Sequence, residues 1–214
     1  MTTFDISKRF AWQGPLSHKA TQLCRMFGLT IDRLTDRAPL HRCKFQAHAG
    51  DIILITGPSG SGKSVLLSEL EQAVPQAQRI NLTQIPLPTN RTVIDCFDTD
   101  IVTSLKTLSV VGISEVFSIL NRPCYLSDGQ KYRFRLAQAL AAGKPYVFAD
   151  EFSSELDRIT ASTVAFNIHK FARRTGTTFV LASSHEDILI DLAPDVLVIN
   201  NASGPAEIIR KSVR

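Results

Sequence analysis

A short glycine-rich segment of the chain has the residue types and spacing that phosphate binding requires. Residues 57–64, GPSGSGKS, fit the pattern G-x-x-x-x-G-K-[ST] between an apolar run and a helical pattern. The glycines let backbone N–H groups turn inward around phosphate oxygens, and the start of the next helix adds its positive dipole end. Lys63 would reach the β- and γ-phosphates, and Ser64 would bind Mg²⁺. A glycine-rich turn with a surface lysine is the alternative, but chance rarely produces the whole pattern in its proper place. The predicted nucleotide-binding residues are Gly57, Pro58, Ser59, Gly60, Ser61, Gly62, Lys63, Ser64 and Val65.

Two adjacent carboxylates follow a second apolar run. The run YVFAD ends at Asp150, and Glu151 comes next. If the run is a strand, both side chains lie at the carboxyl edge of the sheet, beside the glycine-rich loop. Asp150 could then hold Mg²⁺ through water, and Glu151 could polarise an attacking water as general base. Acidic residues after a strand are more often solvated loop or cap residues, but the phosphate-binding pattern favours the catalytic interpretation.

The elements that must position these residues alternate along the chain. From Asp51 onward, short apolar runs alternate with helical patterns, which predicts an α/β fold with a parallel sheet covered on both faces. The Pro-rich joint PLPTN precedes short helical pieces, which we interpret as a helical insertion at about residues 90–143. The alternation of strands and helices then resumes with the strand YVFAD, a long helix from about Arg158 to Gly176, and the strands TTFVLASS and DVLVIN. Residues 1–40 are interpreted as an N-terminal extension, in which KATQLCRMFGL is a short helix or a packed preface.

Composition limits the classes of protein to which the chain can belong. The net charge of +4 and the short basic clusters Lys8-Arg9 and Arg173-Arg174 indicate a mild preference for anionic partners, so nucleic acid stays possible. The four cysteines form no C-x-x-C pair, which predicts reduced thiols rather than a disulfide framework or a metal cage. There is no signal-type apolar core and no apolar run near the roughly 18 residues of a membrane span. We therefore expect a cytoplasmic protein without direct membrane insertion.

A second polar turn runs straight into a basic helical pattern. The stretch YLSDGQKYRFRLAQAL, residues 125–140, could be a nucleic-acid helix or the second half of the nucleotide site. Its LSDGQ lies 24 residues before Asp150 and resembles the LSGGQ signature of the ATP-binding-cassette (ABC) ATPases at that family's usual spacing. In the family this signature caps the γ-phosphate of an ATP held by the partner subunit. Ser127, Gly129 and Gln130 match it, whereas Asp128 replaces a glycine. A carboxylate near a phosphate should lower affinity unless it points away or is paired.

Three further matches in chain order extend the resemblance from about Gly50 to Asn200. Gln84 resembles the glutamine that senses Mg²⁺ and the attacking water, and His185 resembles the switch histidine that contacts the γ-phosphate. The segment SELD, residues 154–157, resembles the D-loop, with Phe152 and Glu155 in place of the usual Pro and Ala. Taken singly, these residues could be a loop amide and helix caps. Together they imply an ABC-type P-loop NTPase domain over residues 41–214.

Two features depart from the family pattern. The aromatic residue that stacks on adenine is expected near Leu34, where the sequence has none. The alternatives are Arg33, Arg37, His41, Phe27 and Trp12. Only about forty residues separate Gln84 from Leu126, fewer than transporter ATPase subunits usually carry, so the resemblance implies a short helical subdomain and weakens a transporter role.

A run of residues indicates a closer resemblance. LSDGQKYRFRLAQALAAG, FADEFSSELDRITA and SSHEDILIDLAPDVLVI are similar to a small family of soluble ABC ATPases that are often joined to a predicted acetyltransferase domain. Because the chain ends at Arg214, an acetyltransferase-like partner is expected to be a separate chain.

The predicted function is that of an ATP-hydrolysing, Mg²⁺-dependent ABC ATPase that forms an ATP-dependent homodimer and acts as a soluble dimerisation switch. The first alternative is the ATP-binding subunit of a membrane transporter. The second is a nucleotide sensor with slow turnover.

Overall fold

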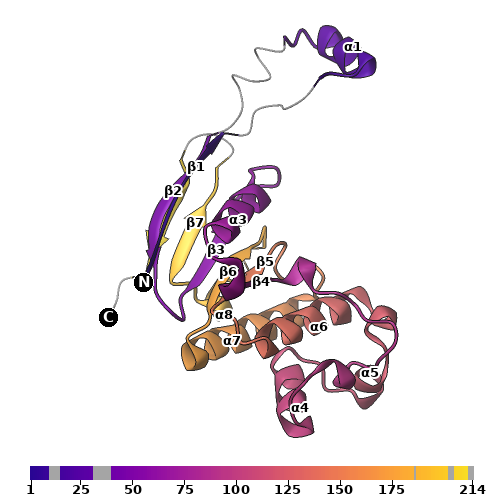
Figure 1. Ribbon diagram of the computed structural model, residues 1–214. Coiled ribbons are helices and arrows are strands. Elements are labelled where there is room, and N and C mark those ends of the chain that lie inside the picture. The colour runs from indigo at the N-terminus through magenta and orange to yellow at the C-terminus, as the bar shows by residue number, and fades with distance from the viewer. Residues whose placement is uncertain (10–14, 31–39, 186, 202–204, 212–214) are drawn as a thin grey trace.

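The computed structural model describes residues 1–9, 15–30, 40–185, 187–201 and 205–211, and a mixed sheet forms its centre (Figure 1). Within these residues the sheet has six strands in the order β4-β5-β6-β3-β7-β8. The strands are β3 (Ile52–Thr56), β4 (Arg79–Asn81), β5 (Tyr146–Ala149), β6 (Thr178–Ala182), β7 (Val196–Ile199) and β8 (Glu207–Arg210). The parallel core predicted from the sequence is confirmed for β3 to β7. The prediction was incomplete at the edge, because β8 pairs antiparallel with β7.

Burial on both faces explains why the central strands are continuous apolar runs. Every residue of β3 and β6 is buried, as expected for parallel strands covered by helices on either side. Successive side chains of β3 point to opposite faces: Ile52 and Leu54 belong to one core cluster, and Ile53 and Ile55 belong to the other. The carboxyl end of β3 is therefore held rigidly between two packed layers.

An antiparallel hairpin covers one of these layers. Strands β1 (Thr2–Arg9) and β2 (Leu40–Ala47) pair along their whole length, and their buried residues join the core cluster that contains α3 (Lys63–Gln72). Burial also raises the pKa of the Cys43 thiol to about 12, so it remains protonated and packs as an apolar group. The division of the chain at residue 40 stays a prediction, although β1 shares its core with the sheet domain.

The sequence between the two hairpin strands contains α1 (His18–Met26). The helix begins at Ser17, whose hydroxyl accepts a hydrogen bond from the Ala20 N–H. None of its residues is buried. The short-helix interpretation of this segment is thus correct, and the packed-preface interpretation is wrong.

Helices on the other face carry the second polar turn of the sequence. The short helices η3 (Ile94–Cys96), α4 (Ile101–Val110), α5 (Val116–Leu120) and η4 (Pro123–Tyr125) lead into α6 (Asp128–Ala141). Helices α6 and α7 (Arg158–Thr175) line the core cluster on this face, and α4 and α5 extend beyond them (Figure 1). Helix α7 begins at the Asp157 cap and ends at Gly176, whose φ of 74° terminates it as the sequence predicts. The remaining elements are η1 (Gln76–Gln78), η2 (Leu82–Gln84) and α8 (Leu189–Leu192). No helix in the described part of the chain is long and apolar enough to cross a membrane.

Candidate nucleotide site

The glycine-rich loop joins β3 to α3 in a conformation that depends on its glycines. Gly57, Gly60 and Gly62 all have positive φ, a region that residues with a Cβ rarely adopt. A Cβ on Gly57 would also lie 2.3 Å from the backbone oxygen of Asn200. Helix α3 then starts at Lys63, so its first N–H groups face the space above the loop. The predicted strand, loop and helix are all present.

A buried amide, which sequence reasoning missed, holds this loop from the neighbouring strand. The Asn200 side chain donates through Nδ2 to the Ser61 carbonyl oxygen at 2.8 Å, and the Asn200 N–H donates to the Thr56 oxygen at 2.8 Å. Asn200 is almost fully buried, so these bonds are shielded from water. The loop is therefore fixed at both ends before any ligand arrives.

A cavity of about 310 Å³ brings the loop together with the two carboxylates. Its lining residues are Ser59, Gly60, Gly62, Lys63, Ser64, Val65, Asp150, Glu151, Ala182, Ser183 and Ser184. The Lys63 ammonium donates to the carbonyl oxygens of Gly57 at 2.8 Å and Pro58 at 3.0 Å. Phosphate oxygens are stronger acceptors than carbonyls for a charged donor, so Lys63 is well placed to exchange these bonds for a nucleotide.

The loop after β5 turns sharply and sets the directions of the carboxylates. Glu151 and Ser153 have φ of 47° and 68°, which is strained backbone for residues other than glycine. The Glu151 N–H donates to Asp150 Oδ1 at 3.0 Å, and the Phe152 N–H donates to the Ala182 oxygen at 2.7 Å. As a result, Asp150 and Glu151 line both the cavity that contains Lys63 and a second cavity next to it. Strain at a carboxylate pair is typical of a site under functional constraint.

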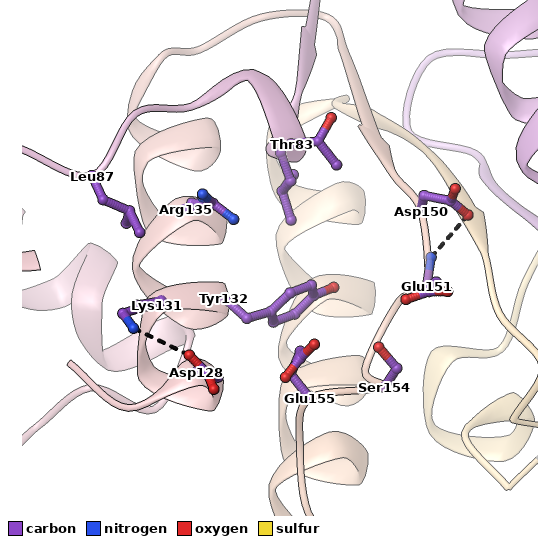
Figure 2. Close-up of a pocket in the computed structure, with 11 residues that line it drawn as sticks. Thr83, Leu87, Asp128, Lys131, Tyr132, Arg135, Asp150, Glu151, Ser154 and Glu155 are labelled. Carbon is purple, nitrogen blue, oxygen red and sulfur yellow. Dashed lines mark hydrogen bonds and ion pairs between the residues drawn. The ribbon is translucent and has the colours of Figure 1, made fainter. Parts of the chain in front are cut away.

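The second cavity, about 380 Å³, lies between α6 and this loop, and we call it the α6 groove (Figure 2). Figure 2 shows Tyr132 reaching from α6 toward the loop that carries Glu151 and Ser154. Lys131 and Arg135 line the α6 side, while Asp150, Glu151 and Glu155 supply negative charge. Arg135 donates through Nε to the Ile85 oxygen at 3.1 Å, which links α6 to the residue that follows Gln84.

The LSDGQ turn forms the start of α6 and does not line the loop cavity of its own chain. The Ser127 hydroxyl accepts from the Gln130 N–H at 3.3 Å, and Gln130 Oε1 accepts from the Ser127 N–H at 3.1 Å, which makes a capping box. A Cβ on Gly129 would lie 2.8 Å from the Glu155 oxygen, so only glycine fits there. Ser127, Gly129 and Gln130 are therefore held rigidly, but outside the cavity that contains Lys63.

Neither Gln84 nor His185 lines the cavity that contains Lys63. Gln84 donates through Nε2 to Glu71 Oε1 at 3.4 Å, and Glu71 accepts from Asn81 Nδ2 at 2.5 Å as well. His185 is exposed and follows Ser183 and Ser184, which do line it. The structure therefore unites the glycine-rich loop with Asp150 and Glu151, and the contributions of Gln84 and His185 stay predictions.

Two hydroxyl groups, on the buried Ser183 and the partly buried Tyr132, connect the predicted catalytic segments, and sequence reasoning missed both. Ser183 Oγ donates to the Phe152 oxygen at 3.1 Å and accepts from the His185 N–H at 3.0 Å. Tyr132 accepts from the Ser153 N–H at 3.4 Å, and its ring packs edge-on against the buried Phe152. Burial raises the pKa of Tyr132, which remains a neutral phenol. No local pattern marks such residues, because each bonds to backbone far away in the sequence.

Ser183→Ala is expected to lower the free energy of unfolding by about 1–3 kcal/mol, because two backbone groups lose their partner inside the protein. The segments that carry Glu151 and His185 should also lose one of their connections, while the bond from the Phe152 N–H to the Ala182 oxygen remains. Urea denaturation measures the first effect, and the rate of ATP hydrolysis measures the second. Ser109→Ala, at an exposed position of α4, is the control. Equal stability of Ser183→Ala and the control would show that the hydroxyl bridge contributes nothing.

The predicted base-stacking residues cannot be placed at the cavity. Trp12, Arg33 and Arg37 lie outside the described residues, as does the side chain of His41. Phe27 follows α1 and is 70% exposed. The source of any base contact therefore stays a prediction.

Comparison with known proteins finds sequence similarity to the ATP-binding proteins of transporters. Residues 40–111 match the family model described as "ABC transporter". The methionine import ATP-binding protein MetN of Bartonella henselae is 28% identical over 84% of this chain and 61% of its own length. MetN of Streptococcus pyogenes serotype M3 is 33% identical over 45% of the chain and 27% of its own length. The chain thus spans about three fifths of the first relative's length and less of the second.

Solved structures share the fold at lower sequence identity. The dimeric ATP-binding cassette MJ0796, in a post-hydrolysis state bound to ADP and Pi, superimposes with a TM-score of 0.61 and 18% identity. The match covers 80% of this chain and 91% of that one. The protein cbiO1 from Clostridium perfringens, part of the ABC transporter complex cbiONQ, gives a TM-score of 0.59 at 17% identity, covering 78% and 79% of the two chains. The predicted fold class is confirmed.

Proposed function

We propose that this chain, which shares its fold with ATP-binding cassettes and resembles methionine import ATP-binding proteins in sequence, binds Mg-ATP in the cavity above the glycine-rich loop and hydrolyses it. One observation carries the proposal: a single cavity contains both Lys63 with Ser64 and Asp150 with Glu151. A phosphate-binding loop alone would serve a sensor, whereas the neighbouring carboxylates add the groups that hydrolysis needs.

Each residue of the cavity has a role that follows from its chemistry. The loop N–H groups and the Lys63 ammonium would bind the phosphates, which replace the carbonyl acceptors that Lys63 now uses. The Ser64 hydroxyl and the Asp150 carboxylate are oxygen donors of the kind Mg²⁺ prefers, so they fit this ion. When bound, Mg²⁺ would neutralise phosphate charge. Glu151 would accept the proton of the attacking water, while Gln84 and His185 would approach the γ-phosphate from the loops that carry them.

A second copy of the chain would complete the site. Ser127, Gly129 and Gln130 form a helix start of the kind that binds phosphate, but they lie outside the cavity of their own chain. The related cassette MJ0796 is described as a dimer in its complex with ADP and Pi. We therefore assign the LSDGQ turn to the nucleotide held by the partner, in a homodimer that closes on two ATP molecules.

Two outputs are compatible with this cycle of closing and opening. The primary proposal is a nucleotide-driven dimerisation switch that acts on a separate protein. The alternative, supply of energy to a membrane transporter, is supported by the similarity to methionine import ATP-binding proteins. None of the relatives described above has a name that points to an acetyltransferase, so such a partner gains no support. Affinity capture with Glu151→Gln and Mg-ATP separates the outputs: recovery of a membrane protein would favour transport, and a water-soluble partner would favour the switch.

A measured turnover rate separates the enzyme from a nucleotide sensor. The wild-type protein should release phosphate from Mg-ATP at a measurable rate, and Lys63→Ala should not. ATP binding without any phosphate release above that of Lys63→Ala would overturn hydrolysis and leave the sensor as the function.

We expect weak discrimination between nucleotide bases, because no aromatic residue occupies the sequence position where the family stacks adenine. GTP should bind within about tenfold of ATP, a difference of ~1.4 kcal/mol in binding free energy. Competition titration against a fluorescent nucleotide measures the ratio. A preference for ATP above about a hundredfold would show that an upstream aromatic residue reaches the base.

A further inference from the structure

An ion pair occupies the start of α6, at the position where the LSDGQ turn departs from the family signature. Asp128 is the first residue of the helix, and its Oδ1 lies 3.1 Å from Lys131 Nζ. The Asp128 side chain is 80% exposed, whereas that of Lys131 is 28% exposed. Figure 2 shows the pair at the edge of the α6 groove, with the two charged groups turned toward each other.

In the isolated chain, the position of the Asp128 carboxylate is electrostatically favourable. An acidic residue in the first turn of a helix interacts well with the positive end of the helix dipole. A solvent-exposed ion pair at this spacing adds little more, because water and salt screen it. Within the part of the chain that the structure describes, the ion pair therefore gives little reason for Lys131 to be a cation.

The closed dimer changes the electrostatics of the same carboxylate. If the LSDGQ turn meets the γ-phosphate of the partner's nucleotide, Asp128 brings a negative charge toward a group that is already negative. Closure also removes water from the interface, which strengthens the repulsion between like charges. An unpaired carboxylate at this position would oppose the step that the helix start is expected to favour.

We propose that Lys131 is a positioning residue that neutralises Asp128 and so permits the dimer to close on ATP. This inference rests on the proposed function. The neighbouring cations of α6 have other partners: Arg133 donates to the carbonyl oxygens of Gly112 at 2.6 Å and Gly129 at 3.3 Å, and Arg135 donates to that of Ile85. Among the α6 residues, all of which the structure describes, Lys131 is the cation paired with a carboxylate.

The remaining negative groups of the groove strengthen the argument. Asp150, Glu151 and Glu155 line it together with Asp128. Among the described lining residues, loss of the Lys131 charge would leave these four carboxylates with one cation, Arg135. The repulsion would act on dimer closure rather than on binding to the loop of the same chain, because Lys131 does not line the cavity of Lys63.

A double-mutant cycle tests the pair. Lys131→Met, Asp128→Asn and the double variant are made in the Glu151→Gln background, in which ATP should be retained. Light scattering with Mg-ATP gives the dimer dissociation constant, and a fluorescent ATP analogue gives the affinity of the monomer. Lys131→Met should weaken dimerisation at least ~10-fold while leaving monomer affinity unchanged. Asp128→Asn should dimerise as tightly as the parent or more tightly, and the double variant should dimerise more tightly than Lys131→Met.

Controls separate this role from a structural one. Lys131→Arg should retain dimerisation, and Lys106→Met on α4 should have no effect. Without nucleotide, the melting temperature of Lys131→Met should stay close to that of the parent, because its partner Asp128 is 80% exposed and water screens the pair. Normal dimerisation of Lys131→Met, or a double variant as weak as Lys131→Met, would overturn the proposal while leaving the proposed function intact. A parent that binds ATP but does not dimerise would overturn both.

Discussion

Glu151→Gln is expected to bind Mg-ATP as well as the wild type and to hydrolyse it at least ~10²-fold more slowly. The amide is nearly isosteric with the carboxylate but cannot accept the proton of the attacking water. Lys63, Ser64 and Asp150, which face the same cavity, remain to hold the nucleotide. Single-turnover release of phosphate measures the chemical step. Size-exclusion chromatography with Mg-ATP should then show an accumulated dimer.

The matched control for this variant is Glu207→Gln, which removes the same charge from the exposed edge strand β8. It should hydrolyse ATP at the wild-type rate. Wild-type turnover by Glu151→Gln would remove Glu151 from the chemistry and leave the strained turn after β5 without a catalytic explanation.

Lys63→Ala is expected to weaken binding of Mg-ATP by ~10²-fold or more, because the phosphates lose their charged donor in the loop. The variant should remain folded, since Lys63 is only part-buried and bonds to two carbonyl oxygens of the loop. Isothermal titration calorimetry measures the affinity. The rise in melting temperature that saturating Mg-ATP gives the wild type should be lost as well.

Lys170→Ala is the control for the loss of a lysine. Its side chain lies over the Phe166 ring on α7 and does not line the nucleotide cavity, so ATP affinity should not change. Unchanged affinity of Lys63→Ala would contradict nucleotide binding in the glycine-rich loop.

Local patterns in the sequence predicted the centre of the fold well. The strand before the loop is a run of buried aliphatic residues, and a glycine-rich turn followed by a helical pattern has few alternatives. The same holds for YVFAD, because a buried strand that ends in two carboxylates places them at the sheet edge. The structure agrees on the loop, on both carboxylates and on the helix that ends at Gly176.

Non-local contacts explain what the sequence did not predict. β1 pairs with β2 across an intervening segment of some thirty residues, and no local signal specifies that pairing. β8 is short and mostly exposed, so its pattern resembles a polar loop. Asn200 and Ser183 act through hydrogen bonds to backbone more than thirty residues away. Such roles depend on the folded geometry rather than on neighbouring residues.

The proposed function depends most directly on a site that two copies of the chain share. Lys63→Ala should lack the loop contact, and Ser127→Arg should block the helix start that meets the partner's γ-phosphate, so each homodimer should be inactive. Mixed in equal amounts, they can form heterodimers with one site free of both changes. Steady-state ATP hydrolysis should then return to as much as about a quarter of the wild-type rate, assuming random pairing and independent sites. Wild-type hydrolysis by Ser127→Arg alone would contradict the shared site, as would no recovery in mixtures shown to contain heterodimer.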